Sequence, residues 1–286
     1  MTQEHKKQVK EALLRYLGTF PSQDAAIHHL GINALLIDQL KNDNCSVISD
    51  ETWYSLARQV GFYCGEWHAA DTAAFMLLKI LFGDARHYAM VYGIAFEDGL
   101  GKTFTAKYYI HNNPGTCYIS CSEDMNRKTF LAELLRCFTD VPAAALPIMM
   151  QRLFDNVCKS GEPLFIIDDA HKLKDRVFHL LLSITALLRD KCGFVIMGNN
   201  GLRKRIADGL QQQKEEYLTF YKAIGRRFIT QSRLSPNDIE IICRTNGLND
   251  EKSISNVKRQ CKGKLYGIES IIRELKHEQT ARPIAA

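Results

Sequence analysis

The residues best suited to chemistry stand in one short segment, Gly99-Leu100-Gly101-Lys102-Thr103. The segment follows an apolar run of strand character and opens a run of helical character, so backbone N–H groups there would point at phosphate oxygens. This spacing predicts a site for ATP, with Lys102 at the β- and γ-phosphates and the Thr103 hydroxyl as a ligand of Mg²⁺. The full pattern, G-x-x-x-x-G-K-[ST], expects glycine where this chain has Phe96.

A second candidate is the apolar run 164–167, which ends in the carboxylates of Asp168 and Asp169. In a phosphoryl-transfer site the first carboxylate holds the Mg²⁺ shell, and the second polarises the attacking water. We assign these two roles to Asp168 and Asp169. Because the second residue is aspartate and not the longer glutamate, we expect hydrolysis to be slow. A strand that ends in a solvated acidic turn is the alternative interpretation.

Three further polar residues could complete such a reaction. Asn199 follows the apolar run 193–197 and could orient the lytic water, or it could belong to an Asn-Gly turn. Arg226 and Arg227 could reach from one subunit into the nucleotide of the next, where an arginine stabilises transition-state charge. A solvated basic turn is the alternative for this pair, and the sequence does not distinguish the two arginines.

These residues lie at the ends of segments that alternate between strand and helix character. Apolar runs predict strands at 88–95, 116–120, 164–167 and 193–197. Apolar residues at helical spacing predict helices at 103–111, 125–138, 146–160 and 177–189. The alternation predicts an α/β fold with a parallel sheet covered on both faces. After Pro236, a small helical lid is predicted from helices at 236–245, 250–260 and 265–277.

The first 61 residues predict a small helix-turn-helix domain. Its helical patterns surround a turn at Gly31 and lie at 6–17, 22–30 and 34–40, with a last helix ending near residue 61. The candidate recognition segment, 33–44, has only Lys41 as a cation. Sequence-specific DNA binding, weak or partner-assisted DNA contact, and a protein-docking or structural bundle therefore remain alternatives. The expected domains are the helix-turn-helix at 1–61, a linker helix at 62–85, the core at 86–232 and the lid at 233–286.

Positive charge is concentrated towards the C-terminal end of this chain of 286 residues. Residues 1–60 hold six Lys/Arg and seven Asp/Glu, whereas residues 201–286 hold seventeen and ten. The excess favours a nucleic-acid partner without demonstrating one. The first candidates for contact with DNA phosphates are Arg203, Lys204 and Arg205. A second cluster consists of Lys258, Arg259, Lys262 and Lys264, and a solvated helix face is the alternative for both.

Composition excludes several classes of protein. With 46% hydrophobic and 24% charged residues, the chain is neither collagen-like nor wholly disordered. Its nine cysteines are an odd number without metal-ligand spacing, and no apolar leader follows Met1, so we expect a cytoplasmic protein without disulfides. The apolar runs are shorter than the roughly 18 residues of a membrane span, so no membrane association is expected.

Taken in order, the loop, the paired carboxylates, Asn199 and the two arginines resemble the AAA+ ATPases, from about Arg86 to the C-terminus. The helix-turn-helix, the loop and Gly198-Asn199 look like transposition regulators of the phage Mu B protein type. The resemblance implies an ATPase that assembles as a ring or filament on duplex DNA and directs a transposase to its target. A helicase-loader-like AAA+ protein, or a nucleotide-switched scaffold with negligible hydrolysis, is the alternative. Tyr266 departs from the pattern, since many AAA+ lids have an arginine there.

Overall fold

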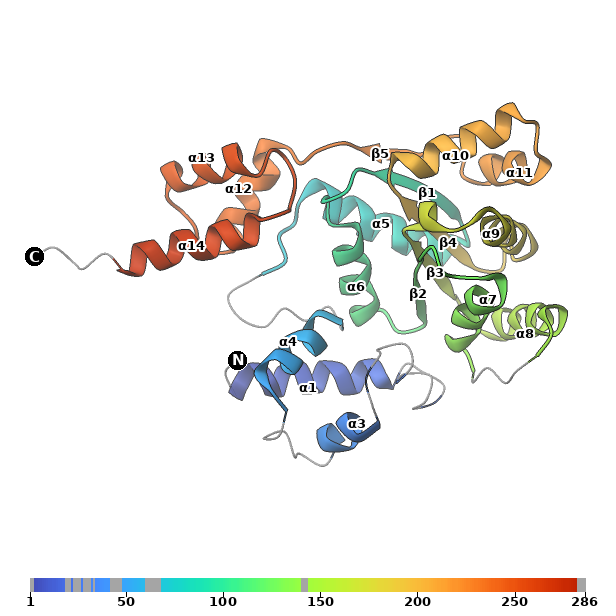
Figure 1. Cartoon of the computed structure of the whole chain (residues 1–286), viewed down its shortest axis with the longest axis horizontal. Helices are drawn as coiled ribbons and strands as arrows, with labels where there is room; N and C mark the ends of the chain where they lie inside the picture. The colour runs from blue at the N-terminus through green and yellow to red at the C-terminus, as the bar shows by residue number, and fades with distance from the viewer. Residues whose placement is uncertain are drawn as a thin grey trace, which may run out of the picture.

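A parallel β-sheet forms the centre of the computed structural model, which describes residues 3–18, 22, 27, 32, 34–41, 48–59, 68–139 and 144–281. Within these residues five strands pair in the order β2-β3-β4-β1-β5 (Figure 1). They are β1 (Val91–Phe96), β2 (Thr116–Ser120), β3 (Leu164–Asp168), β4 (Gly193–Gly198) and β5 (Ile229–Gln231). The predicted α/β fold with a parallel sheet is therefore confirmed, although β5 has no counterpart among the predicted strands.

Alternate residues of each strand face opposite layers of helices. In β3, Leu164 and Ile166 belong to one hydrophobic cluster, whereas Phe165 and Ile167 belong to the other, as the two-residue period of a strand requires. The first cluster includes residues of α5 (Ala73–Tyr88) and α6 (Lys102–Asn112). The second includes residues of α7 (Arg127–Arg136), α8 (Leu146–Lys159), α9 (Asp175–Leu187), α10 (Asn200–Gln211) and α11 (Glu215–Ala223).

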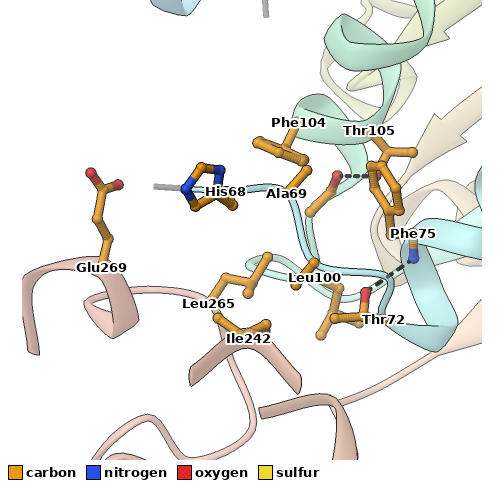
Figure 2. Close-up of a pocket in the computed structure, with 12 residues that line it drawn as sticks. His68, Ala69, Thr72, Phe75, Leu100, Phe104, Thr105, Ile242, Leu265 and Glu269 are labelled. Atoms are coloured by element: carbon orange, nitrogen blue, oxygen red, sulfur yellow. Dashed lines mark hydrogen bonds between the residues drawn. The ribbon is translucent and has the colours of Figure 1, made fainter. Parts of the chain in front are cut away.

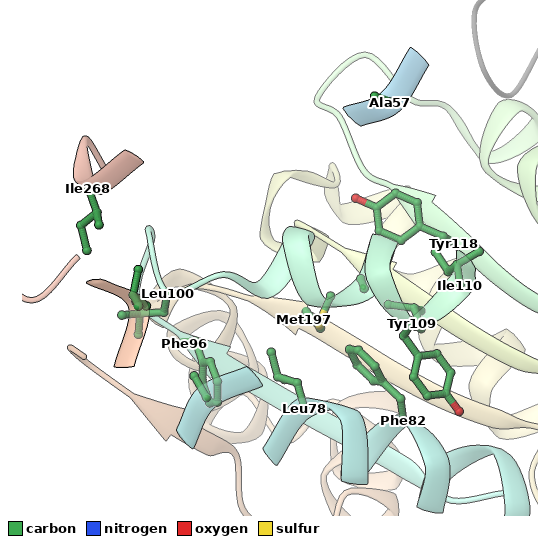
Figure 3. Packing of buried hydrophobic residues seen from close by; sticks show 14 of the residues in the cluster. Ala57, Leu78, Phe82, Phe96, Leu100, Tyr109, Ile110, Tyr118, Met197 and Ile268 are labelled. Carbon is green, nitrogen blue, oxygen red and sulfur yellow. The ribbon is translucent and has the colours of Figure 1, made fainter. Parts of the chain in front are cut away.

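Helix α5 packs against the sheet as part of the core. Leu78 and Phe82 on this helix are fully buried in the first cluster (Figure 3). The sequence predicts a linker helix at 62–85 followed by a strand from Tyr88, but the helix starts at Ala73 and includes Tyr88. Only at Val91 does β1 begin, because the apolar face of α5 continues over the sheet to its last turn.

Three helices precede the core: α1 (Gln3–Leu17), α3 (Ala34–Lys41) and α4 (Asp50–Gln59). Trp53 and Leu13 are buried in the same hydrophobic cluster as α5 and α6, and Figure 1 shows α1 and α4 below α6 and β2. Of the predicted helix 22–30, only Ser22 and Ile27 are among the described residues. The helix-turn-helix domain therefore stays a prediction.

The chain ends in a C-terminal helical unit of α12 (Pro236–Thr245), α13 (Glu251–Gln260) and α14 (Ile268–Ala281). Two buried polar side chains of α12 and its C-cap attach this unit to the segment before α5. Asp238 Oδ1 accepts from the backbone N–H of Ala73 at 2.7 Å. Asn246 accepts from His68 N–H at 2.6 Å and donates to His68 O at 3.2 Å. Among the described residues, none of the helices has both the length and the apolarity that a membrane crossing requires.

Candidate nucleotide-binding site

The glycine loop connects the end of β1 to the start of α6. Gly99 and Gly101 have φ of +83° and +85°, a region in which side chains with a Cβ are strained. Gly101 is the N-cap of α6, so the unpaired N–H groups of the first turn lie directly after the loop. The local geometry is therefore that of an anion-binding helix N-terminus.

Phe96 does not occupy the loop cavity. Its side chain is fully buried in the hydrophobic cluster that also contains Leu78 and Leu100 (Figure 3). Its backbone is outside the left-handed region, so the position does not require glycine. The departure of Phe96 from the phosphate-loop pattern thus leaves the loop conformation intact.

The Lys102 side chain is only 6% exposed and folds back into the loop. Its ammonium donates to the carbonyl oxygens of Phe96 at 2.8 Å and Glu97 at 3.1 Å. Asp98 Oδ1 lies 3.6 Å from the same nitrogen. The cation is thus held at the loop by weak acceptors that phosphate oxygens could replace.

Asp168 lies at the end of β3 and accepts two side-chain hydrogen bonds on one oxygen. Thr103 Oγ1 donates to Asp168 Oδ2 at 2.6 Å, and the Tyr118 hydroxyl donates to it at 3.0 Å. Burial raises the pKa of Asp168, although both hydrogen bonds act in the opposite direction. The structure therefore brings Thr103 and Asp168, both predicted as metal ligands, into direct contact.

The oxygen donors of Thr103 and Asp168 fit Mg²⁺, which prefers oxygen ligands and keeps several waters. Within the described residues, no group of three His, Cys, Asp or Glu side chains could hold a metal ion by itself. This donor set suits a cation that is completed by water and by the phosphates of a substrate.

Asp169, the predicted water-activating residue, is ion-paired in this structure. Its Oδ2 accepts from Lys172 Nζ at 2.6 Å, and this hydrogen bond raises the pKa of Lys172. Lys172 was not among the residues predicted from the sequence, although its position three residues after Asp169 was a usable signal. While this pair persists, the positive charge of Lys172 makes the carboxylate a weaker base towards water.

Asn199 follows β4 and touches the glycine loop. Its Oδ1 caps α10 by accepting from Gly201 N–H at 2.9 Å, and its Nδ2 donates to Asp98 Oδ2 at 3.3 Å. Partial burial raises the pKa of Asp98, but the Asn199 hydrogen bond and the nearby Lys102 charge outweigh this effect and lower it. Both readings of Asn199 are thus compatible with its position, since it caps a helix and also reaches the loop.

The glycine loop, Lys102, Thr103 and the Asp169–Lys172 pair line a cleft of about 500 Å³, which we call the phosphate cleft. It is lined by Asp98, Gly99, Gly101, Lys102, Thr103, Phe104, Asp169, His171, Lys172, Leu265 and Tyr266. A second pocket of about 210 Å³ shares Gly101, Phe104 and Leu265 with it. Figure 2 shows its mainly apolar wall, formed by residues that include Ala69, Phe75, Leu100 and Ile242. The pair of cavities suits a ligand with an apolar ring and a polyanionic end.

Leu265 and Tyr266, which precede α14, connect the C-terminal helical unit to the glycine loop. Leu265 N–H donates to Gly99 O at 2.7 Å. The Tyr266 ring lies against Gly99, where an added Cβ would be 2.6 Å from a ring carbon. The predicted helix 265–277 begins at Ile268 instead, because the preceding residues pack on the loop.

The glycine loop and the buried Asp168 thus lie together in one α/β core with a parallel sheet. Residues 86–206 match the family model described as an AAA domain. This AAA domain runs from the last turn of α5 into α10, so it includes the loop, both aspartates and Asn199. The match supports an AAA-type ATPase domain, and such a domain implies nucleotide binding, usually with Mg²⁺. No curated protein matched the chain in a comparison of sequences.

The remaining predicted residues lie outside the phosphate cleft. Arg226 and Arg227 are exposed on the turn before β5, beyond the AAA domain match. Arg203 and Lys204 are exposed on α10. Arg205 is engaged within the chain, since its guanidinium donates to Asp175 at 2.5 Å and stacks on the Phe178 ring at 4.1 Å. Arg205 is thus held by local contacts, whereas Arg203 and Lys204 are exposed.

Proposed function

We propose that this chain is an ATP-dependent, DNA-binding ATPase that assembles on duplex DNA and regulates the choice of target in transposition. The observation that carries the ATPase part is the hydrogen bond between Thr103 and Asp168 beside the loop-bound Lys102. The DNA and transposition parts are supported by the basic C-terminal half and by the resemblance to regulators of the phage Mu B protein type.

In the first step of this proposal, ATP places its base in the apolar pocket and its phosphates in the phosphate cleft. Lys102 exchanges the carbonyl oxygens of Phe96 and Glu97 for β- and γ-phosphate oxygens. Thr103 and Asp168 would hold Mg²⁺, which supplies positive charge to the phosphates when bound. The helix N-terminus after Gly101 adds N–H donors to the same oxygens.

In the second step, Asp169 leaves Lys172 and accepts a proton from the water that attacks the γ-phosphorus. The bond between that phosphorus and the bridging oxygen breaks, and ADP and inorganic phosphate leave. Phosphate at the cleft offers Lys172 an alternative anion, so nucleotide itself could release the carboxylate. Asn199 would orient the water, and Arg226 or Arg227 of a neighbouring subunit would stabilise the transition-state charge. Because these arginines lie outside the cleft of their own chain, the arginine step requires assembly.

DNA contact in this proposal begins with Arg203 and Lys204. Both are exposed on α10, which follows Asn199 directly, so their position is tied to the end of β4. Contacts with phosphates would be sequence-tolerant, because phosphate positions carry no direct base information. Subunits that assemble side by side would align these residues along the duplex.

A second candidate is a nucleotide-switched interaction scaffold that binds ATP and hydrolyses it negligibly. The ion pair between Asp169 and Lys172 favours it, since a neutralised carboxylate is a poor general base. In this reading nucleotide would change contacts at Gly99 without turnover.

Steady-state phosphate release, measured with and without duplex DNA, distinguishes the two candidates. If the protein is the proposed ATPase, phosphate release should be slow without DNA and faster with DNA. Asp169→Asn should lose this stimulation. Flat, near-zero turnover under both conditions would support the scaffold. The target distribution of strand transfer by a transposase, with and without the protein, tests the transposition part separately.

A further inference from the structure

The C-terminal helical unit contains a second cleft, of about 380 Å³, away from the phosphate cleft. We call it the basic cleft. Its lining consists of Arg233, Leu234, Pro236, Ile239, Lys258, Lys262 and Gly263. Three of these seven residues are cations and none is acidic, so the cleft has the charge of an anion site.

Two of the three cations are available to a ligand. Lys258 Nζ donates to Glu240 Oε2 at 2.8 Å, so its charge is partly balanced. Arg233 and Lys262 are exposed, and among the described residues neither forms an ion pair with a carboxylate. A guanidinium and an ammonium that line the same cleft can both donate to phosphate oxygens.

The basic cleft is joined to the phosphate cleft by one short segment, residues 263–266. Gly263 lines the basic cleft, and its carbonyl accepts from Leu234 N–H at 2.8 Å. Leu265 and Tyr266 line the phosphate cleft, and Leu265 N–H is bonded to Gly99 O. Gly263 and Gly267, with φ of +76° and +78°, stand at the two ends of this segment. A ligand that shifts Gly263 would therefore move a segment that contacts the glycine loop at Gly99.

We propose that the basic cleft binds a backbone phosphate of duplex DNA, and that this contact is linked to nucleotide through residues 263–266. The inference rests on the proposed function and adds a second DNA contact to that of α10. Duplex DNA is the occupant that fits, because the two exposed cations of the cleft can contact one phosphodiester, and the surrounding residues 201–286 carry an excess of positive charge. The basic residues that flank the cleft in the sequence, Arg259 and Lys264, extend the positive charge beyond it.

The test measures how the affinity of the full chain for a labelled duplex depends on salt. Binding is detected by fluorescence anisotropy in the presence of Mg²⁺ and ATP. Arg233→Ala combined with Lys262→Ala should weaken binding and reduce the slope of log affinity against log salt by roughly 0.9 per lost contact. Lys128→Ala combined with Lys159→Ala removes the same charge from exposed positions on α7 and α8 and should change the slope little. Arg233→Lys combined with Lys262→Arg should retain the slope.

Linkage gives a readout that a merely structural effect would not reproduce. If DNA increases the affinity of the protein for a fluorescent ATP analogue by some factor, the analogue increases the affinity of the protein for DNA by the same factor. In the double variant Arg233→Ala with Lys262→Ala, which we call the alanine pair, this factor should approach one. Its affinity for the analogue without DNA should stay at the parent value.

Three results would overturn the inference, each in a recognisable way. Equal slopes in the alanine pair and its control would exclude the basic cleft as a DNA site and leave the proposed function standing. Inorganic phosphate that alters ATP affinity in the parent but not in the alanine pair, with DNA binding unchanged, would make the ligand free phosphate. A parent protein that binds no duplex at all would overturn the proposed function itself.

Discussion

Replacement of Lys102 by methionine should weaken nucleotide binding strongly and largely preserve the fold. The Lys102 side chain is 6% exposed, and methionine keeps most of its apolar stem in that buried channel. What disappears is the ammonium, which donates to the carbonyls of Phe96 and Glu97 in the free protein. In the complex the same ammonium is expected at two phosphate groups.

The two consequences have different sizes. A hydrogen bond to a charged group contributes about 1.5–3 kcal/mol. The loss of two phosphate contacts should therefore weaken ATP binding by about 3–6 kcal/mol, or roughly 10²- to 10⁴-fold. In the free protein the carbonyl of fully buried Phe96 loses its donor, which costs about 1–3 kcal/mol of folding stability. Binding should therefore suffer more than folding.

Fluorescence anisotropy of a labelled ATP analogue measures the first effect, and thermal unfolding measures the second. Lys128→Met is the matched control, because Lys128 is exposed on α7 outside the phosphate cleft. A folded Lys102→Met protein that binds the analogue within about threefold of the parent would refute the assignment of the loop, since the loss of two phosphate contacts should weaken binding by roughly 10²-fold or more.

Asp169→Asn should leave ATP affinity nearly unchanged and lower turnover by about 10²- to 10⁴-fold, the usual contribution of a general base, as phosphate release would show. Because burial raises the pKa of Asp168, its carboxylate takes up a proton at higher pH than an exposed aspartate does. Mg²⁺-dependent ATP affinity, measured against pH, should therefore decrease as the pH falls through that raised pKa, and Asp168→Asn should lack this decrease. Arg203→Ala combined with Lys204→Ala should weaken all duplexes alike and reduce the salt slope by roughly 0.9 for each lost contact; a change confined to one DNA sequence would argue for base contact. Phe82→Ala should lower the free energy of unfolding by about 3–5 kcal/mol, measured by denaturant titration, because its ring is fully buried between α5 and the sheet.

The parts of the structure that the sequence predicts well are those set by local pattern. Strands such as β3 are continuous apolar runs because helices cover both faces of the sheet. The loop at Gly99 to Thr103 needs left-handed glycines next to a helix start, and both features are visible in the residue types. Asp168 follows from the same rule, since the end of a buried strand leads to the edge where the loop lies.

What the sequence does not reveal depends on contacts between distant segments. Tyr118 reaches Asp168 only because β2 and β3 pair in register. The edge strand β5 is three residues long and half-exposed, so it lacks the apolar run by which the other strands are found. Tyr266 packs on Gly99 across more than 160 residues of chain, and no local pattern indicates that contact.

The most direct test of the central claim is duplex DNA binding measured by anisotropy in three states: with a non-hydrolysable ATP analogue, with ADP and without nucleotide. We predict tight binding with the analogue, weaker binding in the other two states, and loss of this difference in Lys102→Met. Equal DNA affinity in all three states, or a Lys102→Met protein that keeps the difference, would contradict the claim that ATP in this cleft controls assembly on DNA.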